Sequence, residues 1–462
     1  MSSPDRRWVI NLLIFSICFS YLVTSIARGP RAPVFGYTTE LYALQAQSFL
    51  QGKTTLPIEP RPELLSLPDP YDAEANKSYR LHDASLYKGK YYLYFGAVPA
   101  VTLFAPYRLL TGRDLPNRVA VPVFCIGGFL SSCALFFLLA RHNRWTLPLW
   151  LECVILISLG SMSLVSLILR RPSFYEVAIA GGYCFVAAGF LALAKAVWET
   201  SNERQWLLLA GLLLGLAVGC RPHLAVICWV VLVSFAIRVS CNLRLMMPLA
   251  ALMLVIGAVL GWYNYVRFDN PFEFGASYQL GGFSFSILQR NFVTLFRSAR
   301  EFLFVAPHLD TSLPFIHTVY INPLTGSDGP VIWTEDTVGL IPAAPFALLG
   351  FSVPLFLRTR RIDKGIDQAS RWLLSTIYWS SIMVFVILCA LGWVMGRYLP
   401  DFAPLLTFDA VVVVAILWQS LPESPNRYAL QWGTSMAAIY GAVLNVAIAT
   451  PRSDLILKFL HK

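Results

Sequence analysis

The chain has few charged residues for its length. Only 13% of its 462 residues are Asp, Glu, Lys or Arg, and 56% are hydrophobic, whereas a soluble domain carries about 25% charged residues. This deficit and the long apolar runs exclude a soluble globular protein and predict an all-α, polytopic membrane protein. The net charge of +10 lies largely in short loops beside apolar runs. It therefore indicates membrane topology rather than a nucleic-acid partner.

The cysteines form no metal-binding or disulfide pattern. They are Cys18, Cys125, Cys133, Cys153, Cys184, Cys220, Cys228, Cys241 and Cys389. All fall within or beside apolar runs or on the expected cytoplasmic side, so we expect no structural disulfide. No C-x-x-C pair or Cys/His cluster points to zinc, and no compact carboxylate cluster supports another divalent metal. No cofactor is predicted, and dependence on a divalent metal stays open.

An internal repeat and a separate soluble domain are also missing, so 1–462 is treated as a single transmembrane domain. The missing repeat argues against a transporter, because many transporters contain two related halves. Eleven apolar runs are long enough to be considered spans. They are 8–26, 119–140, 147–169, 174–197, 205–220, 222–238, 244–266, 337–357, 372–394, 402–421 and 429–449.

Basic residues set the expected orientation of these spans. Arg or Lys occurs in every loop that would face the cytoplasm, most densely from Arg358 to Arg371, as the positive-inside rule requires. The first run follows Arg6-Arg7 and is expected to be an uncleaved span with its N-terminus inside, a cleaved signal peptide being the alternative.

Two long loops then lie outside, 27–118 and 267–336, and both are expected to carry interfacial helices, the one in the second loop running from Phe285 to Phe304. Residues 91–111 are ambiguous within the first loop. As a span they would invert every later loop, but the run is short and rich in Tyr. We therefore expect a helix along the outer membrane surface, with a true span as the alternative.

Two carboxylates in the first external loop are candidate catalytic groups. Glu40 lies on an expected amphipathic helix over 39–51, and Asp83 lies just before the surface helix. A carboxylate with a perturbed pKa near the headgroups can take a proton from a hydroxyl group. The alternatives are a solvated helix face for Glu40 and a turn cap before Gly89 for Asp83.

Arginines occupy three short turns on the same expected outer side. The turns are Arg170-Arg171-Pro172, Arg221-Pro222-His223 and Arg397-Tyr398. A guanidinium group at the membrane edge suits a phosphate, because it donates paired hydrogen bonds. Each arginine could instead extend to the lipid headgroups. Three such turns on one side favour a site for an anionic headgroup.

Several motifs follow one another in a distinctive order. A helix ending SFLQGK precedes DASLYKGKYYLYFGAVPAVTLFAPYRLLTG, and GLAVGCRPHLAV, WYNYVRFDNPFEFGASYQL and GRYLPDFAPLL come later. These stretches resemble membrane glycosyltransferases of the C-type fold, bacterial enzymes related to the protein O-mannosyltransferases and the lipid A aminoarabinose transferase. The resemblance covers most of the chain in topology, and each motif is short.

The resemblance implies a function and a division of roles. A sugar would pass from a polyprenyl-phosphate donor to an envelope acceptor at the outer face of the cytoplasmic (inner) membrane. A carboxylate of the first loop would act on the acceptor hydroxyl. The family usually has an Asp at the start of the first loop helix, where this chain has Thr38-Thr39-Glu40. Glu40 is therefore expected as the base and Asp83 as the second candidate, unless the chain is a non-catalytic relative.

The remaining expected roles concern the donor. Arg170, Arg171, Arg221 and Arg397 would bind its phosphate, and Tyr87, Lys90, Tyr91, Tyr175, His223 and Tyr398 would line the same cavity. Two rival functions stay open: a transporter or flippase for a lipid or anionic solute, and a membrane scaffold without catalysis. A transporter would need charged groups deep in its spans, on a path to both faces.

Overall fold

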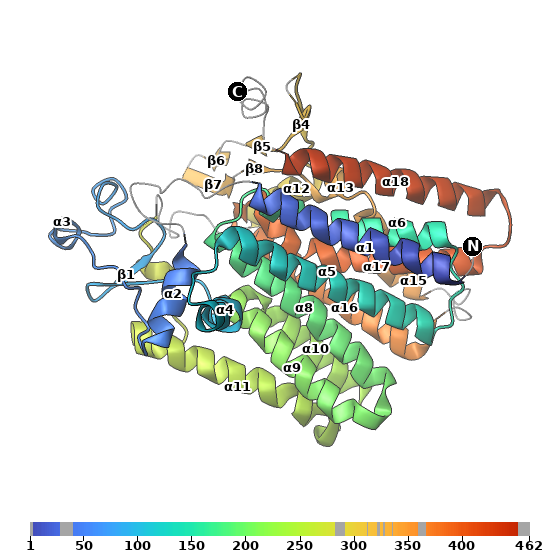
Figure 1. Ribbon diagram of the computed structural model, residues 1–462, viewed down its shortest axis with the longest axis horizontal. Coiled ribbons are helices and arrows are strands. Elements are labelled where there is room, and N and C mark those ends of the chain that lie inside the picture. Colours follow the sequence, from blue (N-terminus) through green and yellow to red (C-terminus); the bar gives the residue numbers. More distant parts are fainter. Residues whose placement is uncertain are drawn as a thin grey trace.

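The structure is a bundle of long helices with two loop layers at one end (Figure 1). The computed structural model describes residues 3–27, 40–281, 292–311, 313–320, 324–326, 329–334, 336–358 and 366–450. Eight helices in these ranges are long and apolar enough to cross a membrane. They are α1 (Ser3–Ile26), α5 (Asn117–His142), α8 (Phe174–Trp198), α9 (Glu203–Cys220), α11 (Leu243–Phe268), α16 (Gln368–Leu391), α17 (Ala403–Ser420) and α18 (Pro425–Ala449). The protein is therefore a polytopic helical membrane protein, as expected.

Three of the eleven predicted spans are not single long helices. The first corresponds to α6 (Leu149–Ser161) and α7 (Ser166–Leu169), and the second to η3 (Pro222–Leu224) followed by α10 (Ala225–Arg238). The third is divided into α13 (Leu340–Ala343), α14 (Ala347–Phe351) and α15 (Val353–Arg358). Prolines at 342, 345 and 354 interrupt this third run, because proline cannot continue the backbone hydrogen-bond ladder of a helix.

Helix α8 lies at the centre of the bundle. It packs against α5 and α9 along its length, and α9 packs in turn against α11. Helices α8 and α17 are the most buried of the long helices, whereas α1 lies at the periphery. The long helices lie roughly along one direction of the bundle, so the chain connections gather at two opposite ends (Figure 1).

The two ends differ in chemistry. The end at which α1 begins holds Arg141, Arg204, Arg238 and Arg427, each next to a helix terminus. The opposite end holds the first loop and the three arginine turns. One end of the bundle therefore carries mainly basic residues beside its helix termini. The opposite end combines arginines with tyrosines and carboxylates, as the loop charges predict.

The first loop folds over its end of the bundle. It comprises α2 (Leu41–Leu50), α3 (Pro62–Leu65), the hairpin β1 (Ser85–Tyr87) and β2 (Lys90–Tyr92), the π-helical turns η1 (Ala100–Phe104), and α4 (Ala105–Thr111). Lys88 and Gly89 join the two strands, both with positive φ, as a tight hairpin turn requires. The helical part of 91–111 starts only at Ala100, and it is too short to cross a membrane.

The second loop is anchored by α12 (Phe292–Phe304). Its buried residues include Thr294, Ser298 and Phe302, and the helix packs against α16. Phe292 and Phe296 remain exposed, so the helix is amphipathic, as expected. The beginning of the predicted helix, 285–291, lies outside the described residues.

Short strands follow α12. They are β3 (His308–Leu309), β4 (Ile316–His317), β5 (Val319–Tyr320), β6 (Leu324–Gly326), β7 (Gly329–Thr334), β8 (Asp336–Thr337) and β9 (Trp393–Val394). Strand β7 pairs in parallel with β9, which directly precedes the third arginine turn. The second loop is thus joined to the connection between α16 and α17.

Candidate functional site

A proline places Arg221 at the outer end of α9. The residue before a proline disfavours the helical conformation, and Arg221 accordingly adopts extended angles where α9 ends. Pro222 then begins the single turn of η3. The reversal directs Arg221 into the protein, where only 7% of its side chain is exposed.

Asp401 forms an ion pair with Arg221. It ends η7 (Gly396–Asp401), the turn between β9 and α17, and its side chain is fully buried. Its Oδ2 lies 3.1 Å from Arg221 Nη2 and 3.2 Å from His223 Nε2. A cavity of about 20 Å³ adjoins Asp401, and this is room for about one water molecule. The carboxylate thus joins the α9–α10 turn to the α16–α17 connection.

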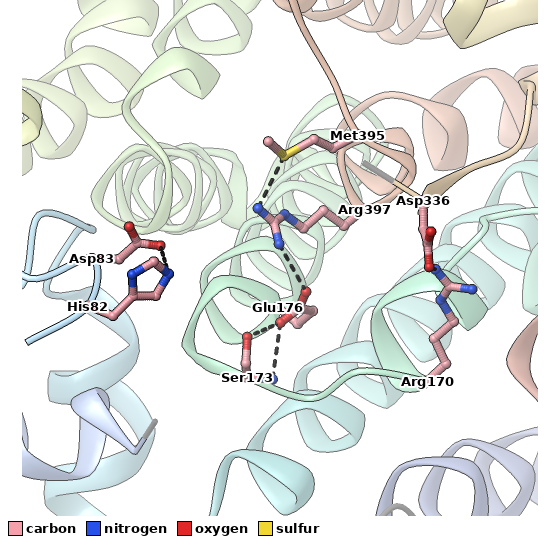
Figure 2. Close-up of polar contacts among 8 residues, drawn as sticks. All are labelled: His82, Asp83, Arg170, Ser173, Glu176, Asp336, Met395 and Arg397. Carbon is pink, nitrogen blue, oxygen red and sulfur yellow. Dashed lines mark hydrogen bonds and ion pairs between the residues drawn. The ribbon is translucent and has the colours of Figure 1, made fainter. Parts of the chain in front are cut away.

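Arg397, in the same turn, is held by a second carboxylate. Glu176 accepts hydrogen bonds from the backbone and hydroxyl of Ser173, which caps α8. Its other oxygen, Oε1, lies 3.9 Å from Arg397 Nη1, while Arg397 Nη2 donates to the sulfur of Met395 at 3.1 Å (Figure 2). The guanidinium also covers the ring of Tyr175, 4.4 Å from its centre.

Tyr398 connects the two arginines. The guanidinium of Arg221 lies 4.7 Å from the centre of its ring, and that of Arg397 lies 5.9 Å away. Cations over an aromatic face are favoured electrostatically, the more so where water is excluded. The side chains Arg221, His223, Arg397, Tyr398, Tyr175, Asp401 and Glu176 are here called the arginine cluster.

Asp83 lies in the first loop, just before the β1–β2 hairpin. It adopts a left-handed conformation with φ of 58°, and its Oδ1 accepts a hydrogen bond from Gln279 at 2.9 Å. His82 lies 3.6 Å from its other oxygen (Figure 2). Left-handed residues other than glycine are uncommon and often occur at functional sites.

Tyr94 of the first loop interacts electrostatically with Asp83 and with the arginine cluster. Burial raises the pKa of Tyr94 well above its usual value, the charge of Asp83 raises it further, and those of Arg397 and Arg221 oppose the rise. Its hydroxyl group therefore lies within electrostatic reach of all three charges. The first loop thus brings a carboxylate and a phenol to the same end of the bundle as the two buried arginines.

Glu40 contacts the start of α5. It precedes α2, and its Oε2 accepts a hydrogen bond of 2.8 Å from the backbone N–H of Asn117, at the start of α5. A carboxylate at a helix N-terminus interacts favourably with the unpaired N–H groups there. Burial raises the pKa of Glu40, and this hydrogen bond partly offsets the rise.

The turn of Arg170 and Arg171 contacts the second loop. Arg170 donates to the hydroxyl of Thr318 at 2.8 Å and lies 3.4 Å from Asp336, both in the second loop (Figure 2). Burial lowers the pKa of Arg170, and the charge of Asp336 opposes that change. Arg171 is partly exposed in the same turn. Arg170 thus anchors the second loop in this structure.

The hairpin residues also lie apart from the cluster. Tyr87 donates to Asp269 at 2.8 Å, and Lys90 is exposed. Tyr91 is only 1% exposed, and its hydroxyl accepts a hydrogen bond from the backbone N–H of Leu81. The hairpin therefore fastens the first loop to the end of α11.

The geometry adds three residues to those expected from the sequence. Asp401, Glu176 and Tyr94 each contact or face the predicted arginines. Asp401 is in the same motif as Arg397, and Glu176 directly follows Tyr175, so proximity to the arginine turns was the available signal. Within the described ranges, no three His, Cys, Asp or Glu side chains gather as they would around a metal ion.

No protein-family model and no curated protein sequence matches the chain. Among solved structures, the Archaeoglobus fulgidus oligosaccharyltransferase in its apo form matches with 12% identity and a TM-score of 0.49, over 95% of this chain and 56% of that chain. The same enzyme, AglB, with an inhibitory peptide and a dolichol-phosphate matches with 12% identity and a TM-score of 0.45, over 96% and 56% of the chains. The chain thus spans little more than half the length of the archaeal enzyme.

A bacterial structure matches over more of its length. ArnT from Cupriavidus metallidurans, bound to undecaprenyl phosphate, matches with 13% identity and a TM-score of 0.46, over 97% of this chain and 76% of that chain. The expected resemblance to the aminoarabinose transferase and related enzymes is confirmed in that these are the structural neighbours found. At such identities and TM-scores they assign neither an activity nor a residue role to this chain.

Proposed function

We propose that the protein is a glycosyltransferase that moves a sugar from a polyprenyl-phosphate donor to an envelope acceptor at the outer face of the cytoplasmic membrane. One observation carries the proposal. Arg221 and Arg397 converge on Tyr398 at the loop-covered end of the bundle, and Tyr94 of the first loop is within electrostatic reach of both arginines and of Asp83. The resemblance of the motifs to C-type-fold glycosyltransferases supports the choice of reaction.

The arginines would bind and stabilise the leaving phosphate. When the bond between the sugar and the phosphate oxygen breaks, negative charge develops on that oxygen. Fixed guanidinium groups in a site with little water stabilise such charge strongly. Arg221 and Arg397 are nearly buried already, so little reorganisation would be needed.

A carboxylate of the first loop would take the proton of the acceptor hydroxyl. Asp83 is favoured because it acts on Tyr94 together with the two arginines, and Glu40 is only the second candidate because its carboxylate already accepts a hydrogen bond at the start of α5. Attack by the acceptor oxygen on the sugar carbon, with departure of the phosphate, needs only one base. A single displacement of this kind would invert the configuration at the sugar carbon.

The decisive experiment is release of polyprenyl phosphate by the purified protein in lipid nanodiscs. The protein would receive a panel of polyprenyl-phosphate sugars and crude envelope acceptor, beside Asp83→Asn, Glu40→Gln and Arg221→Gln. Release by the wild type, lost in Arg221→Gln and in one carboxylate variant, is expected. Tight binding of a donor, without release of polyprenyl phosphate from any donor in the panel, would favour a scaffold.

A transporter is the second candidate, because one carboxylate lies deep in a span. Asp409 of α17 is fully buried, and neither of its oxygens has a hydrogen-bond partner among the described residues. Intramembrane carboxylates often mark ion or substrate pathways. Cysteines placed at Arg221 and Glu40 would decide: an enzyme should be labelled by impermeant thiol reagents from outside only, and a transporter from both sides.

A further inference from the structure

The arginine cluster contains its own counter-ions. Asp401 lies 3.1 Å from Arg221, and Glu176 lies 3.9 Å from Arg397, with no more than 9% of any of these four side chains exposed. We propose that Asp401 and Glu176 act as specificity-determining counter-ions, which restrict the site to lipids with one phosphate and disfavour pyrophosphate-linked lipids. The inference rests on the proposed function and narrows its substrate class.

The physical reason is the balance of charge in a poorly hydrated site. A carboxylate close to a guanidinium offsets much of the positive potential that a ligand would meet, and charge interactions are weakly screened when water is excluded. A phosphodiester carries one negative charge, whereas a diester of pyrophosphate carries two. The second charge would lie near Asp401 and Glu176, where like charges repel.

Both carboxylates leave the arginines able to bind a ligand. Asp401 approaches Arg221 through Nη2, and Arg221 Nε makes no hydrogen bond within the described part of the chain. A guanidinium has five N–H donors in a planar fork, so several remain for a phosphate. The counter-ions therefore change the charge of the site without removing its hydrogen-bonding capacity.

The capping box at the start of α8 fixes the position of the Glu176 side chain. The capping contacts with Ser173 use Oε2, and Oε1 faces Arg397 without a hydrogen-bond partner among the described residues. Glutamine serves in capping boxes as glutamate does. Glu176→Gln thus removes the charge and keeps the cap.

The test compares two soluble lipid analogues, farnesyl phosphate and farnesyl pyrophosphate. As monoesters both carry up to about one more negative charge at neutral pH than the corresponding lipid-sugar diesters, but they still differ from each other by one phosphate. Their binding to the nanodisc-embedded protein would be measured for the wild type, Asp401→Asn, Glu176→Gln and Asp336→Asn. The last variant is the matched control, because Asp336 pairs with Arg170 outside the cluster. We expect the wild type to prefer farnesyl phosphate. Each cluster variant should shift the affinity ratio towards the pyrophosphate by roughly tenfold, about 1.4 kcal/mol, and the control should not.

The possible outcomes are distinct. A ratio unchanged in both cluster variants, or a wild-type preference for the pyrophosphate, would overturn the inference while donor binding still supports the proposed function. Failure of the wild type to bind either analogue would overturn both. Thermal unfolding would check each variant, and Glu176→Gln decides the matter if Asp401→Asn does not fold.

Discussion

Arg221 Nη2 lies 3.1 Å from Asp401 Oδ2, and both side chains are almost completely removed from solvent. The two residues are far apart in the sequence and belong to different helix connections. Their pairing joins the α9–α10 turn to the turn before α17, and it places one guanidinium beside Tyr398. The stability of this end of the bundle and its capacity to bind a phosphate therefore depend on the same contact.

Breaking this pair from one side should destabilise the protein. Arg221→Met leaves Asp401 as a buried charge beside His223, and such losses cost about 3–5 kcal/mol. The double variant Arg221→Met/Asp401→Leu removes both charges and should recover most of that stability. Thermal unfolding in detergent measures both. Additive losses in the double variant would show that the two residues are not coupled.

The two candidate bases should differ in their effect on activity. Asp83→Asn keeps the hydrogen bond from Gln279 but cannot accept a proton, so the rate of sugar transfer should fall by about 10²–10⁴-fold. Glu40→Gln retains an oxygen that can accept from Asn117 and should keep most of the activity. Polyprenyl phosphate release under saturating donor measures both rates. The reverse order of losses would assign the base to Glu40.

Glu40 should also make stability depend on pH. Its folded-state pKa is raised, chiefly by burial, so the folded protein binds more protons than the unfolded chain between the ordinary carboxyl pKa of about 4.3 and the raised value. Stability therefore falls as the pH rises through this window. Glu40→Gln should remove that part of the dependence. The unfolding temperature of the variant minus that of the wild type should therefore increase as the pH rises. Parallel profiles would contradict the assignment.

Gly96 should be essential to docking of the first loop. A Cβ atom there would lie 1.8 Å from the carbonyl oxygen of Gly219, two residues before Arg221. Gly96→Ala must displace the loop or the end of α9, at a cost of about 1–3 kcal/mol or more, and should reduce donor binding. Gly257→Ala is the control, because a Cβ there meets nothing within 4 Å. Equal unfolding temperatures and affinities for the two variants would refute this.

Hydrophobic length and loop charge in the sequence determined most of the bundle. Eight predicted spans are long helices, and the three arginine turns lie at the end opposite the basic loops, because these signals act locally and need no knowledge of packing. The interrupted segment 337–357 shows the limit of that reasoning. Its apolar length suggested a span, but its prolines divide it into three short helices.

Only the tertiary structure decided which turns meet. The sequence made Arg170, Arg221 and Arg397 equivalent, yet Arg170 pairs with Asp336 in the second loop, while the other two share Tyr398. The direction of a side chain at a helix end follows from the backbone angles of the turn and from distant partners, which periodicity does not encode. The same long-range packing brought Glu40 to the backbone of Asn117 and Tyr94 within electrostatic reach of Asp83 and both arginines.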